Sequence, residues 1–526
     1  MEQYKADVVI VGGGLAALRA ALEAKKASPR VLMVSKGRIG KSGCSLISEG
    51  ILNAPISESD SPELFSEDLI KASAGVADVS LAKTFSANAK DEVLGLQSYG
   101  ISFCRDDQEL TLSHSGGHSM ARTVRIDPPG PACGKMIPTT LIKHVHDEDI
   151  ELLEGYQIVK IFTHGDRAAG ALALGKEGFV SISFKSIVLA TGGGGKLYPN
   201  STNPAGIVGD GYYLAHDAGA SLVDMEYVQF FPTVAFENYL VLPFVFSDGA
   251  TLKNKLGERF IEKYDPELKE MTTRDKMSQA IFDEVLEGRG ENGCVFIHFS
   301  DIPEEVLEKK YGKEIEFFKK KGIDVTKQPL PVKPSCHFFM GGIKIDSSCQ
   351  TAIGGLYACG ECAGGVHGAN RLAGNALAEA LVFGAIAGRS AAKYAEDEQY
   401  GSFDPEPYIS SLPEDGTGKR GQELLDQLRS IMWEHLGIIR NEDGILTAMK
   451  KISSIRKEFE SDGATYELKQ YFELRNALHI AYCIAMSALV RNETRGAHYR
   501  SDFPESSQEW AKKIEIRKDF VLSTCK

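Results

Sequence analysis

The stretch ADVVIVGGGLAA at residues 6–17 decides the fold of this chain. Residues 6–11 form a short, nearly all-apolar run rich in valine and isoleucine, which a strand buried on both faces requires. A helix-favouring segment, LRAALEAKKA, occupies residues 18–27, and a second apolar run follows at 31–34. Together these segments predict a strand–helix–strand unit of about 30 residues, which opens a doubly wound parallel sheet.

The turn within this unit has the pattern Gly12-x-Gly14-x-x-Ala17. Such a pattern allows a tight turn, close approach of the backbone to a pyrophosphate, and close helix packing, with the phosphates at the positive end of the helix. At the end of the second strand, Ser35 and Lys36 replace the acid that grips a ribose in a plain NAD site. The pattern therefore predicts a dinucleotide site and favours a flavoprotein.

Two further glycine-rich elements support a flavin cofactor. The apolar run at 186–190 leads into Thr191 and Gly192, as expected for a second approach of the backbone to FAD. The segment GGLYACGE at 354–361 is typical of the element whose acid, here Glu361, contacts the hydroxyls of FAD. Three such elements, far apart in the chain, predict FAD binding.

Composition places the chain among ordinary globular proteins. Its 526 residues, 43% hydrophobic and 25% charged, suffice for about three or four structural units. With a formal net charge of −13 and a pI near 5.5, no nucleic-acid partner is expected. No apolar run approaches the ~20 residues that span a bilayer, and the N-terminal stretch lacks the pattern of a signal peptide.

Ten cysteines are scattered along the chain, which favours reduced thiols in a cytoplasmic compartment over a disulfide framework. Only Cys359 and Cys362 have the close spacing of metal ligands. Without a second such pair, two packed thiols beside the flavin are the favoured interpretation, and we predict no metal site.

The composition and the periodicity of the sequence change along the chain. Lysine-rich amphipathic segments such as EVLEKKYGKEIEFFKKKG, at 305–322, are typical of helices with a solvated face. Glycine-dense sequence returns at 340–390, so we expect the chain to leave the dinucleotide domain and re-enter it. After Pro405, apolar residues spaced i, i+3, i+4 and i+7 predict long helices.

Several segments together carry a family resemblance: GGGLAALRA, LSHSGGHSMART, LATGGGGKLYPN, DMEYVQFFPT, CHFFMGGIKID and RNETRGAHYRSDFP. With them the sequence resembles the flavoprotein subunit of the succinate dehydrogenase/fumarate reductase family, which includes L-aspartate oxidase. The resemblance implies an α/β fold in which a doubly wound FAD-binding domain is interrupted by an α+β capping domain and followed by a helical C-terminal domain. The expected ranges are 1–237 and 336–400 for the FAD-binding domain, 238–335 for the capping domain, and 405–526 for the helical domain.

The resemblance also implies a reaction: hydride transfer between flavin N5 and a C=C/C–C bond adjacent to a carboxylate. Arg274, in the segment TTRD, matches the proton-transferring arginine of the family. His337 and Arg371 match the clamp on one substrate carboxylate, and an arginine fork with a histidine donor suits that task. By the same resemblance the FAD-binding residues are Gly12, Gly14, Ala17, Ser35, Lys36, Ser42, Gly43, Gly50, Thr191, Gly192, Asp210, Glu361, Arg371, Ala376 and Leu377.

The sequence departs from the family at the second carboxylate. The family's QFHPT is QFFPT here, so Phe231 replaces a histidine donor. The family's Thr-Glu segment and relay arginine have no plain counterpart: an ungapped count back from the GERF segment places Leu242 and Pro243 there, and a short deletion places Ser247 and Asp248 there. Ser247 is the chemically closer candidate for a substrate contact.

Two more departures concern the oxidase branch and the flavin link. Ser115 stands where the aspartate oxidases carry a glutamate that reads the substrate ammonium. Cys44 stands where covalent members carry the flavin-linking histidine, so non-covalent FAD is expected.

The leading hypothesis is an FAD-dependent oxidoreductase, the catalytic subunit of a fumarate reductase-like complex, whose substrate need not be fumarate itself. Because the chain has no iron–sulfur cysteine pattern, we expect an iron–sulfur partner protein, and a cytoplasmic location in which membrane contact comes only through partners. L-aspartate oxidase, which needs no such partner, is the alternative. A third hypothesis is a non-catalytic electron-relay flavoprotein that has lost its relay residues.

Overall fold

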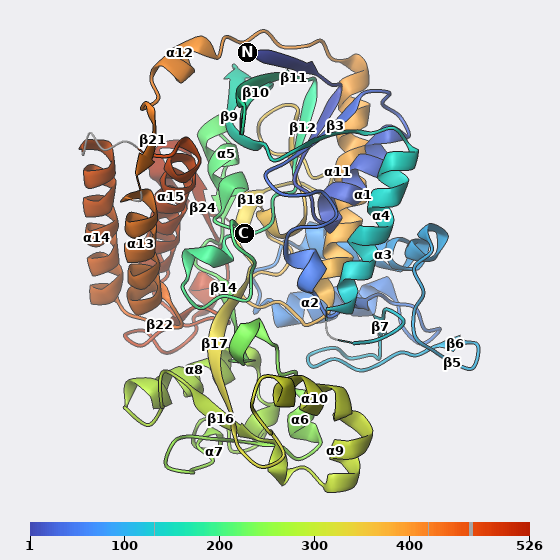
Figure 1. The fold of residues 1–526 in the computed structure, drawn as a ribbon, viewed down its shortest axis with the longest axis vertical. Coiled ribbons are helices and arrows are strands. Elements are labelled where there is room, and N and C mark those ends of the chain that lie inside the picture. The colour runs from blue at the N-terminus through green and yellow to red at the C-terminus, as the bar shows by residue number, and fades with distance from the viewer. Residues whose placement is uncertain (131, 419, 462–465, 526) are drawn as a thin grey trace.

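The computed structural model describes residues 1–130, 132–418, 420–461 and 466–525. Figure 1 shows three regions: the FAD-binding region with α1 and α11, a capping region at the bottom of the view that holds α6–α10, and a helical region with α13–α15. The FAD-binding and capping regions are joined by two long strands.

The predicted opening unit is confirmed. Strand β2 (Val8–Val11), helix α1 (Leu15–Lys25) and strand β3 (Val31–Ser35) follow one another, and β2 pairs with β3 in parallel. The full sheet has the order β19-β12-β2-β3-β8, all parallel, with β8 at Glu151–Glu154, β12 at Ser186–Leu189 and β19 at Leu356–Ala358. Since β19 follows the capping region in sequence, the chain re-enters its first domain here.

Helix α11 (Asn375–Asp397) packs directly on α1 through glycine. A Cβ on Gly384 would lie 2.7 Å from the carbonyl oxygen of Ala16, and one on Gly388 would lie 2.2 Å from that of Ala20. From one contact to the next the residue numbers increase on both helices, from 16 to 20 on α1 and from 384 to 388 on α11, so the helices run parallel. Their first turns therefore lie toward the same end of the sheet, where a dinucleotide is received.

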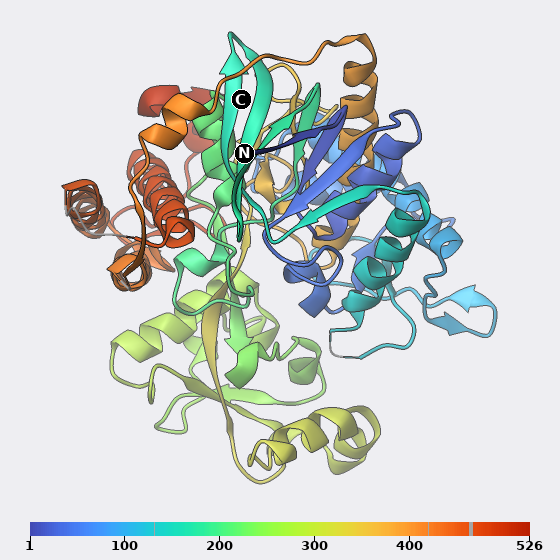
Figure 2. The same ribbon diagram turned by 45° about the horizontal axis from the view of Figure 1, so that its top comes forward.

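Further elements complete the FAD-binding region. A second sheet, order β1-β11-β10-β9, lies above the parallel sheet and comes forward in Figure 2. Its strands are β1 (Glu2–Lys5), β9 (Gln157–His164), β10 (Arg167–Gly175) and β11 (Gly178–Ser183). The remaining elements are α2 (Pro62–Ala72), α3 (Val79–Gly95), α4 (Met136–Asp147), α5 (Asp210–Ala218), β4 (Ile51–Asn53), β5 (Arg105–Asp106), β6 (Glu109–Leu110) and β7 (Thr123–Arg125).

The capping region has its own sheet and its own hydrophobic core. Antiparallel strands β14 (Val228–Val234) and β17 (Leu330–Phe339) lead into and out of it, and the sheet order is β14-β17-β16-β15. Its core draws on buried side chains from Ala235 to Val332. The other elements are β15 (Thr251–Lys253), β16 (Val295–His298), α6 (Phe244–Ser247), α7 (Ile261–Tyr264), α8 (Arg274–Leu286), α9 (Glu304–Lys310) and α10 (Gly312–Lys320).

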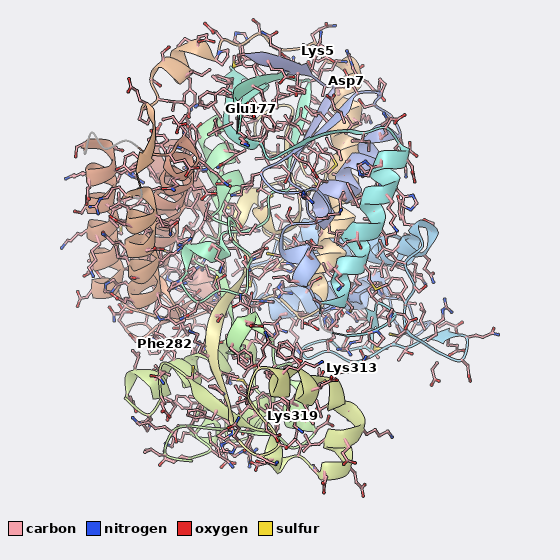
Figure 3. The ribbon with its side chains drawn as sticks, viewed as in Figure 1. Lys5, Asp7, Glu177, Phe282, Lys313 and Lys319 are labelled. Carbon is pink, nitrogen blue, oxygen red and sulfur yellow. The ribbon has the colours of Figure 1, made fainter. Side chains whose placement is uncertain are left out.

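The helical region follows as predicted, with α12 (Glu406–Ser410), α13 (Arg420–Leu436), α14 (Glu442–Ser461) and α15 (Leu468–Val490). It touches the capping region through Phe282 on α8, labelled in Figure 3, whose ring lies 5.6 Å from that of Trp433 on α13. Short strands β21 (Asp415–Gly418) and β22 (Ile439–Arg440) lie between these helices, and β23 (Tyr499–Arg500), which follows α15, pairs with β22.

The end of the chain is not helical. Strands β24 (Lys513–Arg517) and β25 (Val521–Cys525) join β13 (Leu222–Val223), β18 (Gly342–Lys344) and β20 (Ala363–Gly364) in one sheet. The expected helical range, 405–526, therefore includes two strands that belong to a sheet of the FAD-binding region. The alternation of polar and apolar residues in KIEIR at 513–517 favours a strand, and the prediction of a wholly helical range overlooked it.

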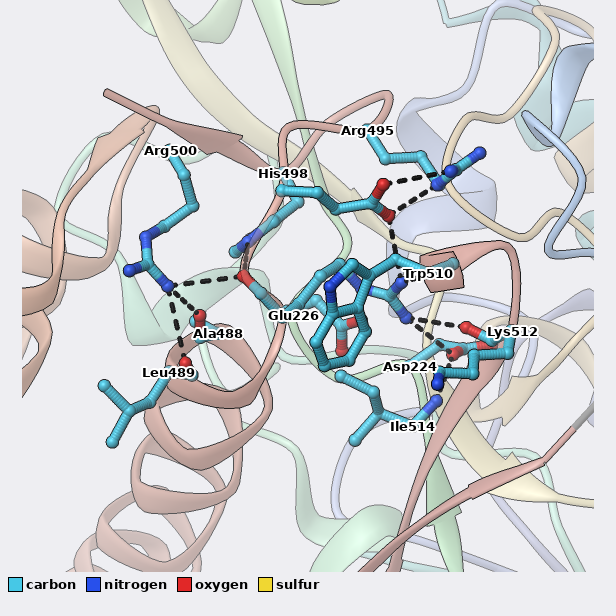
Figure 4. Close-up of polar contacts among 12 residues, drawn as sticks. Asp224, Glu226, Ala488, Leu489, Arg495, His498, Arg500, Trp510, Lys512 and Ile514 are labelled. Carbon is cyan, nitrogen blue, oxygen red and sulfur yellow. Dashed lines mark hydrogen bonds and ion pairs between the residues drawn. The ribbon is translucent and has the colours of Figure 1, made fainter. Parts of the chain in front are cut away.

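A buried arginine cluster, formed largely by the segment RNETRGAHYRSDFP at 491–504, ties the helical region to the FAD-binding region (Figure 4). Arg491 donates to Glu226 Oε1 at 2.6 Å and to Glu493 Oε1 at 3.2 Å. Arg495 donates to both oxygens of Glu493 at 2.6 and 2.9 Å. Arg500 donates to backbone carbonyls at the end of α15.

None of the helices in the described ranges is long and apolar enough to cross a membrane.

Candidate functional site

The first turn of α1 is shaped for close approach of a ligand. Gly12 has a φ of +132°, and a Cβ there would lie 2.2 Å from the carbonyl oxygen of Ala190. Gly14, at the N-cap position of α1, has no capping side chain, and the N–H of Leu15 donates to Ser45 Oγ at 3.2 Å. Backbone N–H groups at the start of a helix that lack a cap are natural donors to phosphate oxygens. With Ala17 fully buried beneath the turn, this end of α1 fits the pyrophosphate of a dinucleotide.

The second and third glycine elements meet at Glu361. A Cβ on Gly193 would lie 2.2 Å from Glu361 Oε1, and a Cβ on Gly211 would lie 2.0 Å from the hydroxyl oxygen of Thr191. Glu361 accepts a hydrogen bond from the N–H of Phe339 at 3.1 Å. Burial raises the pKa of Glu361 to about 7. A buried carboxyl of this kind, lined by glycine, fits the hydroxyl groups of FAD.

Other residues assigned to FAD by resemblance lie near these turns. Lys36 Nζ donates to Asp210 Oδ2 at 2.6 Å, so two of the predicted residues meet each other, and Asn476 on α15 donates to the second oxygen of Asp210 at 2.9 Å. Ser35 accepts from the N–H of Gly37 at 3.3 Å.

The remaining assignments fall on turns and on the start of α11. Gly43 and Gly50 have φ of +86° and +62°, which favours glycine at both positions. The hydroxyl of Ser42 donates to the backbone four residues earlier at 2.7 Å. Ala376 and Leu377 occupy the first turn of α11. All of these FAD contacts stay predictions at the level of single residues.

Four predicted substrate residues are brought together by strands β14 and β17 and helix α8. The guanidinium carbon of Arg274 lies 4.7 Å from the ring centre of Phe231, whose ring lies 5.4 Å from that of His337. Arg371 Nη2 donates to Gln229 Oε1 at 2.8 Å, two residues before Phe231 on β14. Sequence positions as distant as 231 and 371 thus form one group, which we call the clamp: Phe231, Arg274, His337 and Arg371.

The clamp is rich in positive charge. Burial lowers the pKa of Arg274 to about 9, with a further contribution from Arg371. Burial also lowers the pKa of Arg371 to about 10, although Glu361 and Glu379 act in the opposite direction. His337 has a pKa well below its usual value because of burial and then of both arginines, so its imidazole is neutral.

In the part of the chain that the structure describes, no carboxylate oxygen lies within 4.0 Å of a nitrogen of Arg274 or Arg371. Nε of Arg371 is buried and, among the same residues, has no hydrogen-bond partner. Buried cations without a counter-charge cost several kcal/mol. An anionic ligand would offset that cost, so the arrangement suits the binding of a carboxylate.

Three supporting residues were missed by the sequence analysis. Thr202 Oγ1 lies 2.9 Å from His337 Nδ1, and Asn203 Nδ2 donates to the carbonyl of His337 at 3.1 Å. Gln229 donates back to the carbonyl of Arg371 at 3.0 Å. The only sequence signal was position: Thr202 and Asn203 directly follow the quoted segment LATGGGGKLYPN, and Gln229 lies inside DMEYVQFFPT.

Ser247 does not join the clamp in the described structure. Its side chain is exposed on α6, and its hydroxyl donates to the carbonyl of Phe244 in the same short helix at 2.8 Å. Asp248 is engaged by Lys310 and Tyr311 at 2.7 and 2.6 Å. Leu242 lines a cavity of about 80 Å³ between the capping region and the FAD-binding region. These contacts therefore give no support to the alignment with a short deletion, which placed Ser247 and Asp248 at the substrate.

Cys359 and Cys362 are fully buried thiols, and the Cys362 thiol donates to the carbonyl of Leu189 on β12 at 3.0 Å. Ser115 pairs with the hydroxyl of Thr123 at 2.9 Å. Burial raises the pKa of the Cys44 thiol well above its usual value, so it is protonated.

The doubly wound fold and the glycine-lined cradle define the class of protein: the chain is an FAD-dependent oxidoreductase. Residues 7–377 match the FAD binding domain family, and residues 425–521 match the fumarate reductase flavoprotein C-terminal family. The chain belongs to the family of succinate dehydrogenase and fumarate reductase flavoproteins, in which L-aspartate oxidases are also found.

Several relatives cover almost the whole chain. An uncharacterized FAD-dependent oxidoreductase of Methanocaldococcus jannaschii is 41% identical over 98% of this chain and 96% of its own length. A fumarate reductase (CoM/CoB) subunit of Methanothermobacter marburgensis is 36% identical over 98% of each chain. L-aspartate oxidase of Nostoc sp. is 31% identical over 96% of this chain and 92% of its own.

The fold is also that of a solved enzyme. The FrdA chain of E. coli quinol fumarate reductase is 28% identical, with a TM-score of 0.90 over 100% of this chain and 97% of that one. The predicted cofactor, family and reaction class are thereby confirmed, whereas the substrate and the roles of single residues stay predictions.

Proposed function

We propose that this protein reduces the C=C bond of an enoate that is held by one carboxylate and is apolar at its other end. The observation that carries the proposal is the clamp. The guanidinium groups of Arg274 and Arg371 have no carboxylate within 4.0 Å among the described residues, and Arg274 lies against the ring of Phe231 rather than a polar donor. This proposal names the substrate class of an established type of oxidoreductase.

Arg371 and His337 hold the carboxylate. Gln229 fixes one end of the Arg371 fork at 2.8 Å, which orients the remaining N–H groups. A neutral His337 donates from Nε2 in the tautomer whose Nδ1 accepts from the hydroxyl of Thr202, 2.9 Å away, and this is the tautomer that we propose for the bound carboxylate. Charge that develops on the carboxylate during reduction is then stabilised by fixed donors.

Arg274 delivers the proton. FAD, when bound, supplies the hydride at flavin N5 for one alkene carbon. Arg274 protonates the neighbouring carbon, and its lowered pKa, about 9, makes it a better donor near neutral pH than an ordinary guanidinium. The stacked ring of Phe231 fixes the guanidinium in place.

Phe231 selects the other end of the substrate. A second carboxylate against this ring, without its donor, would cost about 1–3 kcal/mol. An apolar tail would instead gain ~25 cal/mol per Å² of surface that it buries. Fumarate, a dicarboxylate, is therefore not the best substrate.

Electrons reach the flavin through a second protein. No iron–sulfur cysteine pattern occurs in the chain, and its thiols in the described ranges are unpaired. An iron–sulfur partner protein fits a two-electron flavin with no single-electron exit of its own, and a relative at 36% identity is named as one subunit of a fumarate reductase (CoM/CoB). We place the protein in the cytoplasm, with membrane contact only through partners.

FAD is held without a covalent link. Cys44 replaces the linking histidine, and its protonated thiol is a poor nucleophile. Acid precipitation of the purified protein should release the yellow colour into the supernatant. Flavin that stays with the pellet would contradict this part of the proposal.

The proposal is tested by reducing the purified flavoprotein anaerobically and following flavin reoxidation by fumarate, acrylate and cinnamate-type acids. We expect the monocarboxylic acids to give the larger second-order rate constants. Preference for fumarate would overturn it. Reduction of the flavin by L-aspartate with oxygen as acceptor would instead favour the oxidase alternative, and reoxidation by no enoate would favour the electron-relay alternative.

A further inference from the structure

Two histidines and a cysteine meet between helices α5 and α15, away from the clamp. His216 comes from α5, and His479 and Cys483 come from α15, where a spacing of four residues puts them on one face. One ligand atom from each of the three lies within 4.8 Å of the others, and His216 and Cys483 are buried. Neither the cofactor cradle nor the clamp uses any of them.

The orientation of His216 is already that of a metal ligand. Its Nε2 lies 3.0 Å from the carbonyl oxygen of Arg517 and donates to it, which places the free lone pair on Nδ1. That Nδ1 points at His479 Nε2, 2.7 Å away. Metal-bound histidines are typically fixed by such a bond from the other ring nitrogen to a backbone carbonyl.

Aromatic side chains close the site: the ring of Phe520 lies 5.0 Å from that of His479 and 5.8 Å from that of His216, and Tyr213 packs edge-on against His479 at 5.1 Å.

We propose that His216, His479 and Cys483 form a binding site for Zn²⁺. Two imidazole nitrogens and one thiolate sulfur are a donor set that this borderline ion prefers. Tetrahedral bonds of about 2.0–2.3 Å place ligand atoms roughly 3.3–3.8 Å apart. Rotations of the Cys483 and His479 side chains therefore suffice to form the site from the present 2.7–4.8 Å separations. The fourth position is left for a water molecule.

Binding of the metal displaces two protons from its ligand atoms. The Cys483 S–H bond breaks, an S–Zn bond forms, and that proton goes to solvent, while His479 shifts its ring proton from Nε2, which donates to His216 Nδ1 in the absence of metal, to Nδ1. Occupancy would join α5, which begins at the FAD-binding residue Asp210, to α15 and, through Arg517, to the end of β24. The sequence analysis predicted no metal site, because it considered only the Cys359–Cys362 pair.

The test uses the FAD-loaded protein after treatment with a chelator. Zn²⁺ is returned in the presence of a chromophoric competitor, and bound metal is counted by mass spectrometry after gel filtration. We expect one equivalent for the wild type and a higher thermal midpoint with Zn²⁺. Co²⁺ in place of Zn²⁺ should give a thiolate-to-cobalt absorption band in the difference spectrum.

Variants decide whether the ion sits at this place. His216→Ala and Cys483→Ala should each lose the equivalent and the cobalt band, while Cys294→Ser, a partly exposed thiol in the capping region, should keep both. Flavin content and the absorption spectrum verify folding of each variant. The proposal is overturned by a wild type that retains no metal, or by an equivalent that all three variants retain.

Discussion

Two arginine-rich centres of this molecule are balanced in opposite ways. In the arginine cluster, Arg491 donates to Glu226 and Glu493, and its pKa is raised by neighbouring groups, of which Glu226 contributes most. In the clamp, Arg274 and Arg371 have pKa values lowered to about 9 and about 10. No carboxylate of the described residues pairs with either of them within 4.0 Å.

The difference separates structural charge from functional charge. A guanidinium that is saturated by carboxylates and carbonyls holds segments together, as Arg491 does between α15 and the residues before β14. A guanidinium that is buried without a counter-ion reduces stability unless a ligand supplies the missing anion. The clamp therefore has the electrostatics of an anion-binding site, whereas the charges of the arginine cluster are paired and hold parts of the structure together.

The largest expected effect is on turnover. Arg274→Ala should lower kcat by about 10²–10⁴-fold, because a positioned proton donor is lost, while FAD content stays unchanged. Arg274→Lys keeps the charge without the fork geometry and should rescue only in part. Lys276→Ala, two residues on and with a 56% exposed side chain, is the matched control and should leave kcat unchanged. Near-normal turnover of Arg274→Ala would remove this residue from the mechanism.

The opposite outcome is expected in the arginine cluster. Arg491→Met leaves Glu226 and Glu493 buried without their partner and should lower the free energy of unfolding by about 3–5 kcal/mol. Chemical denaturation followed by fluorescence measures this loss. Arg517→Met, whose side chain is 61% exposed beside Glu515, should cost no more than about 1 kcal/mol. Equal losses in the two variants would erase the distinction between the centres.

Giving the clamp a second donor should shift its selectivity. Phe231→His restores a hydrogen-bond donor for a second carboxylate, and a recovered interaction of about 1–3 kcal/mol raises kcat/KM for fumarate relative to cinnamate-type acids by roughly tenfold or more. Phe231→Leu, which removes the ring and adds no donor, is the control. A fumarate preference that rises equally in both variants would show that size, not hydrogen bonding, sets the selectivity.

The pH dependence gives the smallest effect. Arg274 must be protonated to donate, and its folded-state pKa is about 9, so the protonated fraction falls as pH rises through this value. kcat/KM should decline above about pH 9, approaching tenfold per pH unit. A bound carboxylate favours the charged guanidinium, so the decline in kcat should begin at a higher pH. Flat profiles of both parameters to pH 10.5 would contradict this role of Arg274.

Much of the fold was accessible from local sequence. The strand–turn–helix at 6–25 follows from apolar runs and glycines that lie next to one another in the chain, and the structure confirms it. The strands β24 and β25 were not foreseen, although the alternation in KIEIR at 513–517 favours a strand. The sheet that they join is set by β13, nearly 300 residues earlier, with which β24 pairs, whereas β25 pairs with β24 itself.

The residues of the candidate site likewise fall into those that the sequence predicted and those that it did not. Arg274, His337 and Arg371 were found through motif resemblance. They come together because Phe231 on β14 contacts Arg274 and His337, and Gln229 on the same strand contacts Arg371. Thr202 and Gln229 were missed because a hydrogen bond across the fold leaves no pattern in sequence. Ser247 was proposed because a short deletion relative to the family pattern places it at the substrate. The sequence alone does not fix where that deletion lies, and the structure places Ser247 exposed on α6.

The central claim is that the clamp binds one carboxylate beside an apolar surface. Its most direct test is the binding of two enoates, cinnamate and fumarate, to the oxidised protein under anaerobic conditions, where the flavin has no electrons to reduce them; binding is followed by the change in the flavin spectrum at pH 7. We predict that cinnamate binds with the lower Kd and that Arg371→Gln weakens it by at least tenfold. Tighter binding of fumarate, or binding of either acid that Arg371→Gln leaves unchanged, would contradict the account.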